Sequence, residues 1–415
     1  MVRIKPFRAW RPRQDLVSRV VCPPYDVVST EEAAALARGN PISFLHVIRS
    51  EIDLEKGISP YDPRVYKKAA ENLRRLIEEG GLVREEEQSL YVYQQKMGDH
   101  VQAGLVFGAS VEDYLEGRIK RHEQTRKEKE EDRTRHIQAT GMNTGPVFLC
   151  YRDRREVDGI VDSVRSGSPL YDLTTEDGVE HTVWRVSDPE TVEELRAAFS
   201  RVPELYIADG HHRAASSVRV ALERRKAEPG YTGEEPWNYF LAVAFPHDQL
   251  MVLGYHRVVR DLGGLEEEAF LAELRKKFEV ERGGDPLPRG RGRFGMFFRD
   301  GWWSLAYKDG DPFEREDPVA RLDVAVLQNH VLGPILGIKD PRTDERIDFV
   351  GGIRGVPELE RLCREEGWAL AFTLFPTSVE DLMAVADAGR MMPPKSTWFE
   401  PKLRSGLLVR SLDDD

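Results

Sequence analysis

One short stretch joins an apolar strand directly to a polar helix, and it constrains the local fold more than any other part of the chain. It reads Leu-Tyr-Ile-Ala-Asp-Gly-His-His-Arg over residues 205–213. Residues 205–208 have the apolar pattern of a buried strand, and Gly210 supplies the backbone freedom that a tight turn requires. A helix is expected from His211 to about residue 225. The stretch therefore predicts a strand that turns within two residues into a helix.

This turn is a candidate binding site. The start of a helix leaves backbone N–H groups without partners, and their partial positive charge favours a bound phosphate or carboxylate. Arg213 adds a fork of hydrogen-bond donors, and Asp209 adds an anionic oxygen that can hold Mg²⁺. The alternative is purely structural, with Asp209 as a helix cap, Gly210 as a turn residue and the two histidines in solvent. Both interpretations stay open on these residues alone.

The composition excludes several classes of protein. The chain has 415 residues, 40% of them hydrophobic, which is enough for two or three packed regions. Its 72 acidic and 60 basic residues give a net charge of −12, the reverse of what binding to nucleic-acid phosphates selects. No apolar stretch reaches the length of a membrane span, and the first residues lack a secretory signal. We therefore expect a cytoplasmic protein without a nucleic-acid or membrane partner, and the oligomeric state stays open.

Glycine, proline and hydrophobic periodicity divide the chain into three expected regions. Residues 1–89 form an N-terminal lobe. Residues 90–260 form a core that contains the turn and a long charged helix as an insertion. Residues 261–415 form a C-terminal α/β region. Because strands and helices occur throughout, the expected fold class is α+β.

Several elements are predicted within these regions. Helices are expected near residues 30–38 and 63–79. Two hairpins are expected, one around Gly98 and a second over residues 239–258. The stretch 283–292 is rich in glycine and proline and predicts a surface loop.

Residues 118–136 form the second informative stretch because of their dense charge. At helical steps of four and three, five potentially cationic side chains fall on one stripe: His122, Arg126, Lys129, Arg133 and His136. Such a stripe can line an anion site, although charged helices of this kind are commonly solvated faces. Glu123 differs from the rest, because it is expected at the helix start beside His122 and Thr125. There its carboxylate can accept a proton from a hydroxyl substrate if the fold brings it near Asp209.

The sequence argues against several standard catalytic sites. His211 and His212 are neighbours on a helix, where side chains point about 100° apart, so they do not form a paired zinc site. The three cysteines show no C-x-x-C spacing. No phosphate-binding P-loop, complete dinucleotide fingerprint or G-x-S-x-G elbow occurs. Mg²⁺ held by one carboxylate and substrate phosphates needs none of these patterns.

The third stretch covers residues 391–407, where prolines, lysines and hydroxyl side chains surround aromatic residues. This composition predicts a shaped loop. Lys395, Ser396 and Thr397 can reach a phosphate from such a loop. The alternative is a C-terminal arm that packs Trp398 and Phe399 against the body of the protein.

Four motifs together resemble a bacterial and archaeal family known as domain of unknown function 1015, over essentially the whole chain. The motifs are Cys22-Pro-Pro-Tyr-Asp-Val27, Arg121-His-Glu-x-Thr125, Ile207-Ala-Asp-Gly-His-His-Arg213 and Met392-Pro-Pro-Lys-Ser-Thr397. The D-G-H-H-R turn is also similar to the ParB/sulfiredoxin-like fold, and most closely to free serine kinases that make O-phosphoserine. The resemblance implies a ParB-like mixed α/β core with α/β elaborations at both ends.

The resemblance to these kinases also implies roles for individual residues. Glu123 matches the catalytic glutamate, and residues 209–213 match the turn that holds phosphate and amino acid. The transferred phosphate would lie against Gly210, His211 and Arg213, with His212 stabilising its charge and His122 beside it. Asp209 would hold Mg²⁺ or the amine of the substrate. From their place in the sequence rather than from the resemblance, Arg126 and Lys395, with Ser396 and Thr397, are expected to add further phosphate contacts.

The expected function is therefore phosphoryl transfer to a free amino acid, with L-serine as acceptor and ATP, ADP or pyrophosphate as donor. The chain departs from the kinases, since about 85 residues separate Glu123 from Asp209 and large regions lie on both sides. Two other functions fit the same motifs. One is a ParB-like switch that binds a nucleotide without turnover, and the other is a small-molecule binding protein without catalysis.

Overall fold

The chain forms two compact units. The computed structural model describes residues 1–310, 314 and 316–414. Unit 1 comprises Met1–Leu250 together with Pro401–Asp415, and unit 2 comprises Met251–Glu400. Unit 2 is thus inserted into unit 1 near the end of the chain. The sequence suggested three regions, and the first two of these share unit 1.

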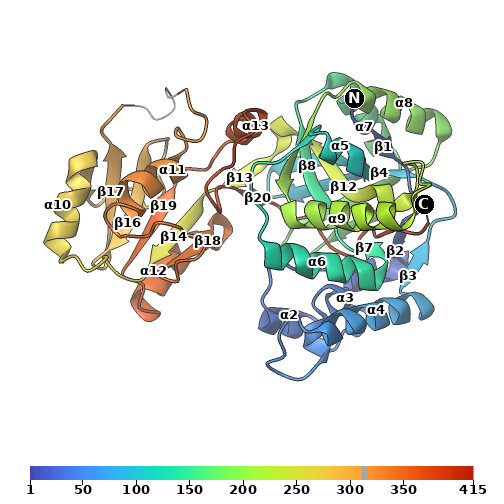
Figure 1. Cartoon of the computed structure of the whole chain (residues 1–415), viewed down its shortest axis with the longest axis horizontal. Coiled ribbons are helices and arrows are strands. Elements are labelled where there is room, and N and C mark those ends of the chain that lie inside the picture. Colours follow the sequence, from blue (N-terminus) through green and yellow to red (C-terminus); the bar gives the residue numbers. More distant parts are fainter. Residues whose placement is uncertain (311–313, 315, 415) are drawn as a thin grey trace. The chain divides into compact units, whose positions relative to one another are not determined.

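Unit 1 is built on a nine-stranded mixed sheet (Figure 1). Across the sheet the strands follow in the order β6 (Ile119–Lys120), β11 (Leu205–Asp209), β8 (Val147–Tyr151), β12 (Tyr239–Pro246), β5 (His100–Ser110), β4 (Leu90–Met97), β10 (Glu180–Val186) and β9 (Tyr171–Thr174). The ninth strand, β1 (Ile4–Lys5), pairs with the end of β5. Most neighbours are antiparallel, but β6 runs parallel to β11 and β8 runs parallel to β12.

The two expected hairpins have different outcomes. β4 and β5 form the first one, with Met97 paired to His100 across the turn at Gly98. The prediction of a second hairpin over residues 239–258 is wrong. Strand β12 is buried along its whole length and is paired on both edges, with β5 and β8, so the chain after it has no free edge to join. That segment instead supplies strands of unit 2.

Helices cover the sheet of unit 1 (Figure 1). They are α1 (Val17–Val20), α2 (Thr30–Leu36), α3 (Leu45–Ile48), α4 (Pro63–Glu78), α5 (Val111–Leu115), α6 (Lys127–Thr140), α7 (Arg155–Arg165), α8 (Pro189–Ser200) and α9 (His211–Ala227). The main core is formed by one face of the sheet with α7, α8 and α9, through side chains such as Phe107, Phe199 and Val218. α6 packs beside α9, and α4 packs against α6.

The N-terminal segment has a hydrophobic cluster of its own, which includes Phe44, Leu45 and Leu73. It nevertheless belongs to unit 1, because β1 joins the large sheet and β2 (Trp10–Pro12) pairs with β3 (Leu82–Arg84). The C-terminal arm belongs there as well. Its strand β21 (Arg410–Ser411) pairs with β7 (Met142–Asn143), and Val409 lies in the N-terminal cluster.

The charged helix differs from its prediction. α6 begins at Lys127, with the extended residue Arg126 before it, and ends at the left-handed Gly141. His122 and Arg126 therefore precede the helix, and Glu123 does not begin it, so the predicted five-residue cationic stripe is wrong. His136 is buried, and this burial lowers its pKa to about 4, which leaves the ring neutral at pH 7.

Unit 2 is built on a six-stranded antiparallel sheet. The strands follow in the order β15 (Phe278–Arg282), β17 (Gly301–Tyr307), β16 (Arg293–Phe298), β19 (Leu370–Leu374), β14 (Tyr255–Val259) and β18 (Ile347–Gly351). A separate pair joins β13 (Met251–Leu253) to β20 (Trp398–Glu400). The helices are α10 (Glu267–Lys277), α11 (Asp323–Leu327), α12 (Gly355–Glu365) and α13 (Val379–Asp387). As expected, residues 283–292 form a loop.

These elements confirm the α+β fold class expected from the sequence. The expected helices near 30–38 and 63–79 correspond to α2 and α4, each within two residues at its ends. None of the helices within the described residues has the length and apolar character that crossing a bilayer requires.

Buried neutral histidines predict that unit 1 loses stability in mild acid. Burial and the nearby Arg404 guanidinium lower the pKa of His181 to about 3. Because this lies below the unfolded-state value of about 6.5, the unfolded chain binds the proton first as the pH falls. The stability that the neutral ring contributes is therefore lost progressively from about pH 6.5 downward, by about 1.4 kcal/mol per pH unit.

Urea denaturation at several pH values checks this prediction. The His181→Gln variant should show a flatter decline in unfolding free energy between pH 6.5 and 4.5 than the unchanged protein. His100→Gln, at a half-exposed position in β5, should keep the original slope. An unchanged slope in His181→Gln would show that this ring is already protonated in the folded state.

Candidate functional site

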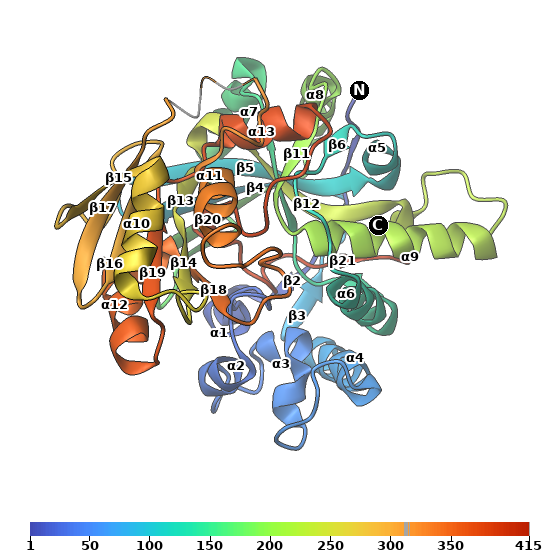
Figure 2. The ribbon, with the colours of Figure 1, turned by 60° about the vertical axis from the view of Figure 1, so that its left-hand side comes forward.

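The site begins with the parallel pairing of β6 and β11, which are seen side by side in Figure 2. Ile119 is paired with Leu205, and Lys120 with Tyr206. Parallel strands end at the same edge of a sheet, so the residues that follow them are brought together. The segment after β6 contains His122 and Glu123, and β11 ends at Asp209. A donor atom from each of His122, Glu123 and His211 lies within 4.8 Å of the other two. Glu123 therefore reaches the turn.

The turn itself has the strand-to-helix form expected from the sequence. Gly210 has φ 91° and ψ 30°, in the left-handed region that favours glycine. The Asp209 Oδ1 atom accepts a hydrogen bond from the Gly210 N–H at 2.8 Å. The N-cap residue Gly210 has no side chain and so makes no side-chain cap. The start of this 17-residue helix is the kind of position at which anions bind.

Asp209 is held as a carboxylate by its neighbours. Its Oδ2 atom lies 3.5 Å from Lys402 Nζ, which comes from the C-terminal arm. Burial alone would raise the pKa of Asp209, but Lys402, Arg213 and the Gly210 N–H together lower it well below its ordinary value. Asp209 therefore carries a negative charge at any physiological pH.

Arg213 is fixed by groups from two other parts of unit 1. Its guanidinium donates to the Pro146 carbonyl oxygen, and its Nη2 atom lies 3.1 Å from Asp26 Oδ2. Burial would lower the pKa of Arg213, but Asp26 and Asp209 raise it above its ordinary value. The side chain is only 12% exposed, so this cation is rigidly placed beside the turn.

His122 and His211 form the buried floor of the site. They are 2% and 5% exposed, and their rings meet edge to face with centroids 4.5 Å apart. Burial lowers the pKa of His122 to about 4, partly offset by Asp209 and by a hydrogen bond to the Ile207 backbone. Burial and the neighbouring His122 also hold the pKa of His211 well below its ordinary value. Both rings are therefore neutral at pH 7.

His212 connects the two halves of the site. Its Nε2 atom accepts a hydrogen bond from the Arg126 backbone N–H at 3.0 Å. This bond ties the segment after β6 to the first turn of α9. One ring nitrogen of His212 is thereby occupied, and Arg126 takes part through its backbone. Whether the side chains of His212 and Arg126 contact a phosphate is not tested by this hydrogen bond, and both contacts stay predictions.

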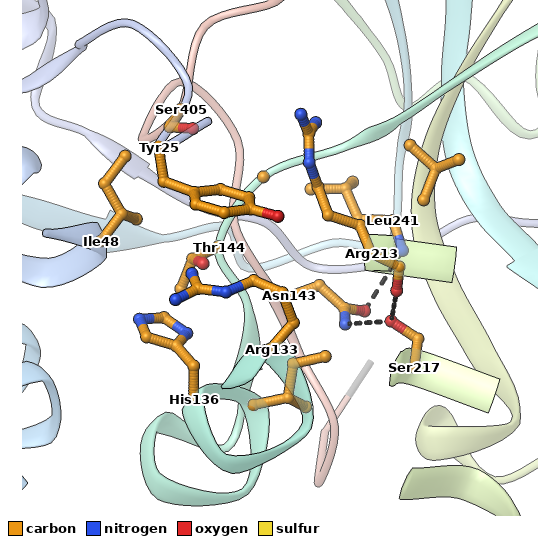
Figure 3. Close-up of a pocket in the computed structure, with 13 residues that line it drawn as sticks. Tyr25, Ile48, Arg133, His136, Asn143, Thr144, Arg213, Ser217, Leu241 and Ser405 are labelled. Carbon is orange, nitrogen blue, oxygen red and sulfur yellow. Dashed lines mark hydrogen bonds between the residues drawn. The ribbon is translucent and has the colours of Figure 1, made fainter. Parts of the chain in front are cut away.

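A small pocket, with about 30 Å³ of space for water-sized molecules, lies beside Arg213 (Figure 3). Figure 3 shows the Tyr25 ring between the guanidinium groups of Arg133 and Arg213, which lie 4.1 and 5.9 Å from its centroid. Ser217 and Asn143 form a hydrogen-bonded pair at the opposite side of the pocket. Both arginines are also paired with carboxylates, Arg133 with Asp132 and Arg213 with Asp26. Each of the two cations that line the pocket is therefore neutralised by a carboxylate.

The remaining predicted residues lie in unit 2, in the turn before β20. Lys395 has a positive φ of 58°, and its carbonyl oxygen accepts from Arg257 at 2.9 Å. The hydroxyl of Ser396 is buried and donates to the Pro393 carbonyl oxygen. Thr397 follows in the same turn and is half-buried. This arrangement confirms a shaped loop, while its contact with a phosphate stays a prediction.

Sequence reasoning missed Asp26 and Lys402 as parts of the site. Asp26 belongs to the motif at residues 22–27, whose sequence carried the family resemblance but gave no role. Lys402 lies in the lysine-containing stretch from which Lys395 was chosen. The signal for both was present, but their partners lie far away in sequence, and only the fold shows which residues meet.

Comparison with known families supports the resemblance seen in the motifs. The family model described as a protein of unknown function, DUF1015, matches residues 4–325, which is most of the chain. The chain belongs to the DUF1015 family. No curated protein sequence matches it.

Several solved structures are similar to this DUF1015 member, although distantly. A mutant free serine kinase in complex with ADP shares 15% identity and has a TM-score of 0.35, covering 72% of this chain and 88% of its own. SbnI from Staphylococcus aureus, with a C-terminal truncation, shares 12% identity at a TM-score of 0.37, covering 74% and 87%. A conserved hypothetical protein from Pyrococcus furiosus shares 12% identity at a TM-score of 0.34, covering 74% and 95%. Likeness at this level does not bear on the chemistry of the site.

The left-handed backbone at Gly210 predicts a substitution effect. An added Cβ would lie 3.5 Å from the Val147 Cα atom, which is ordinary contact, so the strain comes from the backbone alone. Gly210→Ala should lower the free energy of unfolding by about 1–2 kcal/mol.

Thermal denaturation monitored by circular dichroism measures this effect. Gly159→Ala is the matched control, because Gly159 lies inside α7 and has open space around its Cβ position. That variant should be as stable as the unchanged protein or more stable, by up to about 1 kcal/mol. Equal stability of the two variants would contradict a strained turn at Gly210.

Proposed function

We propose that this protein transfers a phosphoryl group to the hydroxyl of a free amino acid. L-serine is the proposed acceptor, and a nucleotide or pyrophosphate is the proposed donor. The observation that carries the proposal is the position of the Glu123 carboxylate, within 4.8 Å of a His211 ring nitrogen in the first turn of α9. A proton acceptor and an uncapped helix start are the two parts that such a reaction needs.

The first part binds the phosphate that is transferred. The amides of His211 and His212 and the positive end of the α9 dipole favour an anion at this position. Lys402 stands beside Asp209, and the guanidinium of Arg213 is held near Gly210 by Asp26. A phosphoryl-transfer transition state needs positioning and charge neutralisation more than covalent catalysis, so these fixed cations and dipoles suit it.

Asp209 is the proposed ligand for Mg²⁺. It stays ionised, it is half-buried, and one of its oxygens faces Lys402 rather than a second carboxylate. One protein carboxylate together with donor phosphates matches the usual coordination of Mg²⁺ in such enzymes. When bound, the ion would neutralise charge on the donor phosphates. The amine of the amino acid is the alternative partner for the same carboxylate.

The second part acts on the acceptor. Glu123 would accept the proton of the serine hydroxyl. At the same time the serine hydroxyl oxygen forms a bond to the terminal phosphorus of the donor. The bond between that phosphorus and the bridging oxygen breaks, and the electron pair leaves with the remaining phosphate or nucleotide. The products are O-phosphoserine and the shortened donor. The small pocket at Tyr25 and Ser217 lies next to Arg213.

The acceptor is chosen from the motif resemblance to free serine kinases, and the donor stays open among ATP, ADP and pyrophosphate. Two kinase structures of this type were solved with ADP or AMP bound, which describes those proteins. For the present protein, we propose the binding of an adenine nucleotide of the same kind.

A direct assay tests the function. Purified protein is incubated with L-serine, Mg²⁺ and each donor in turn, and O-phosphoserine is detected by mass spectrometry. We expect product with at least one donor. Glu123→Gln should reduce the rate by about 10²–10⁴-fold, because it removes the base but keeps the shape of the side chain.

Two further variants serve as a control for Glu123 and as a test of the proposed Mg²⁺ ligand. Glu128→Gln changes an exposed glutamate in the first turn of α6 and should keep full activity. Asp209→Asn should lower activity and weaken its dependence on Mg²⁺ concentration. If no donor yields product, the serine assignment is wrong. Nucleotide binding without product would then favour a ParB-like nucleotide switch, and absence of binding would favour a non-catalytic protein.

A further inference from the structure

The floor of the site contains three potential metal ligands, and the proposed reaction uses the side chain of only one of them, Glu123. They are His122, Glu123 and His211, and one donor atom of each lies within 4.8 Å of the other two. The histidines come from different segments, so the adjacent pair His211 and His212 is not the relevant one. Two imidazoles and one carboxylate form a set that first-row transition metals bind in proteins.

Two buried ring nitrogens at this place lack partners. Across the part of the chain that the structure describes, His122 Nδ1 and His211 Nε2 have no hydrogen-bond acceptor or donor. Both side chains are more than nine-tenths buried. A buried polar atom without a partner destabilises the folded state, so such atoms in a folded protein call for an explanation. Two of them on rings in contact, beside a carboxylate, are explained by a shared cation.

The other nitrogen of His122 is already oriented. The ring is hydrogen-bonded to the backbone of Ile207 in β11. Because Nδ1 has no partner, Nε2 is the nitrogen that would donate to this backbone group. Metal-binding histidines usually donate their second N–H to a carbonyl or carboxylate, which fixes the ring and leaves the opposite nitrogen as ligand. This arrangement would leave His122 Nδ1 as the ligand atom.

We propose that His122, Glu123 and His211 bind one divalent first-row transition ion, with Zn²⁺ as the preferred cation. Around a tetrahedral ion with bonds of about 2.1 Å, donor atoms lie about 3.4 Å apart. Small side-chain rotations bring donors that already lie within 4.8 Å to this spacing. Three protein ligands leave at least one coordination position open for water or a hydroxyl group.

This site differs from the proposed Mg²⁺ position at Asp209. Magnesium prefers oxygen ligands, whereas two imidazole nitrogens select zinc and its neighbours in the series. The inference goes beyond the proposed function and does not depend on it. A bound transition ion would occupy the Glu123 carboxylate, so the same residue would serve as ligand in the metal-loaded protein and as base in the metal-free one.

Metal binding is measured without any phosphate donor or amino acid, which separates this test from the kinase assay. The full-length protein is stripped with a chelator and titrated with Zn²⁺ by calorimetry. We expect one Zn²⁺ per chain, with an affinity that excess Mg²⁺ does not change. Titration with Co²⁺ should give the visible absorption of a four- or five-coordinate ion with nitrogen ligands.

Variants assign the ligands. His211→Ala and Glu123→Gln should each weaken Zn²⁺ binding by at least about tenfold, since even changes outside the ligand set often do so. Glu123→Gln preserves size at a half-buried position, so it keeps the test valid if His211→Ala does not fold, which circular dichroism checks. His100→Ala and Glu128→Gln, which remove a histidine and a carboxylate elsewhere, should bind as the unchanged protein does. Absence of stoichiometric Zn²⁺ binding, or equal affinities in Glu123→Gln and Glu128→Gln, would overturn the proposal.

Discussion

The site depends on the parallel pairing of two very short stretches of strand, β6 and β11. Only Ile119 with Leu205 and Lys120 with Tyr206 are in register, yet this pairing decides where the two following segments lie. The hydrogen bond from the Arg126 backbone to His212 reinforces it from the helical side. If β6 were displaced, Glu123 would no longer lie close to the turn, while Asp209 and Gly210 would stay in place. The carboxylate and the helix start are therefore coupled through backbone geometry.

Charge in the site is balanced pair by pair. Asp209 faces Lys402, Arg213 faces Asp26, and Arg133 faces Asp132. Paired charges at partly buried positions keep their ionisation and their orientation, whereas isolated ones would shift their pKa and neutralise. The two buried histidines complement this pattern, because they stay neutral where the carboxylates and cations stay charged. The result is a fixed electrostatic pattern within a chain whose overall charge is strongly negative.

Local patterns in the sequence predicted a good part of this arrangement. The strand and helix on either side of Asp209 and Gly210 follow from apolar residues, a glycine and a helix-compatible run, all within a few positions. The hairpin at Gly98 has the same local character. The hairpin after β12 failed because pairing on both edges of that strand is a property of the sheet, which the local pattern does not show.

The parts of the site that sequence reasoning missed are those made by distant segments. Strand β6 is two residues long and has no periodicity to detect, so its parallel pairing could not be anticipated. The start of α6 was predicted near Glu123 but lies at Lys127, and this error also comes from a contact with a distant segment. The segment before it is held extended by contacts with α9, and these outweigh a sequence that would also suit a helix. The partners of Asp209 and Arg213 likewise come from opposite parts of unit 1.

The insertion of unit 2 gives the chain a particular order of assembly. Residues 1–250 contain nearly all of unit 1, but Lys402 and strand β21 are synthesised only after the whole of unit 2. During synthesis from the N-terminus, Asp209 therefore exists for a time without its lysine, and β7 exists without its partner strand. The segment that follows unit 2 thus supplies the cation that pairs with Asp209. A nascent chain that ends before Pro401 would contain the strand and helix of the site but would lack Lys402, the cation that pairs with Asp209.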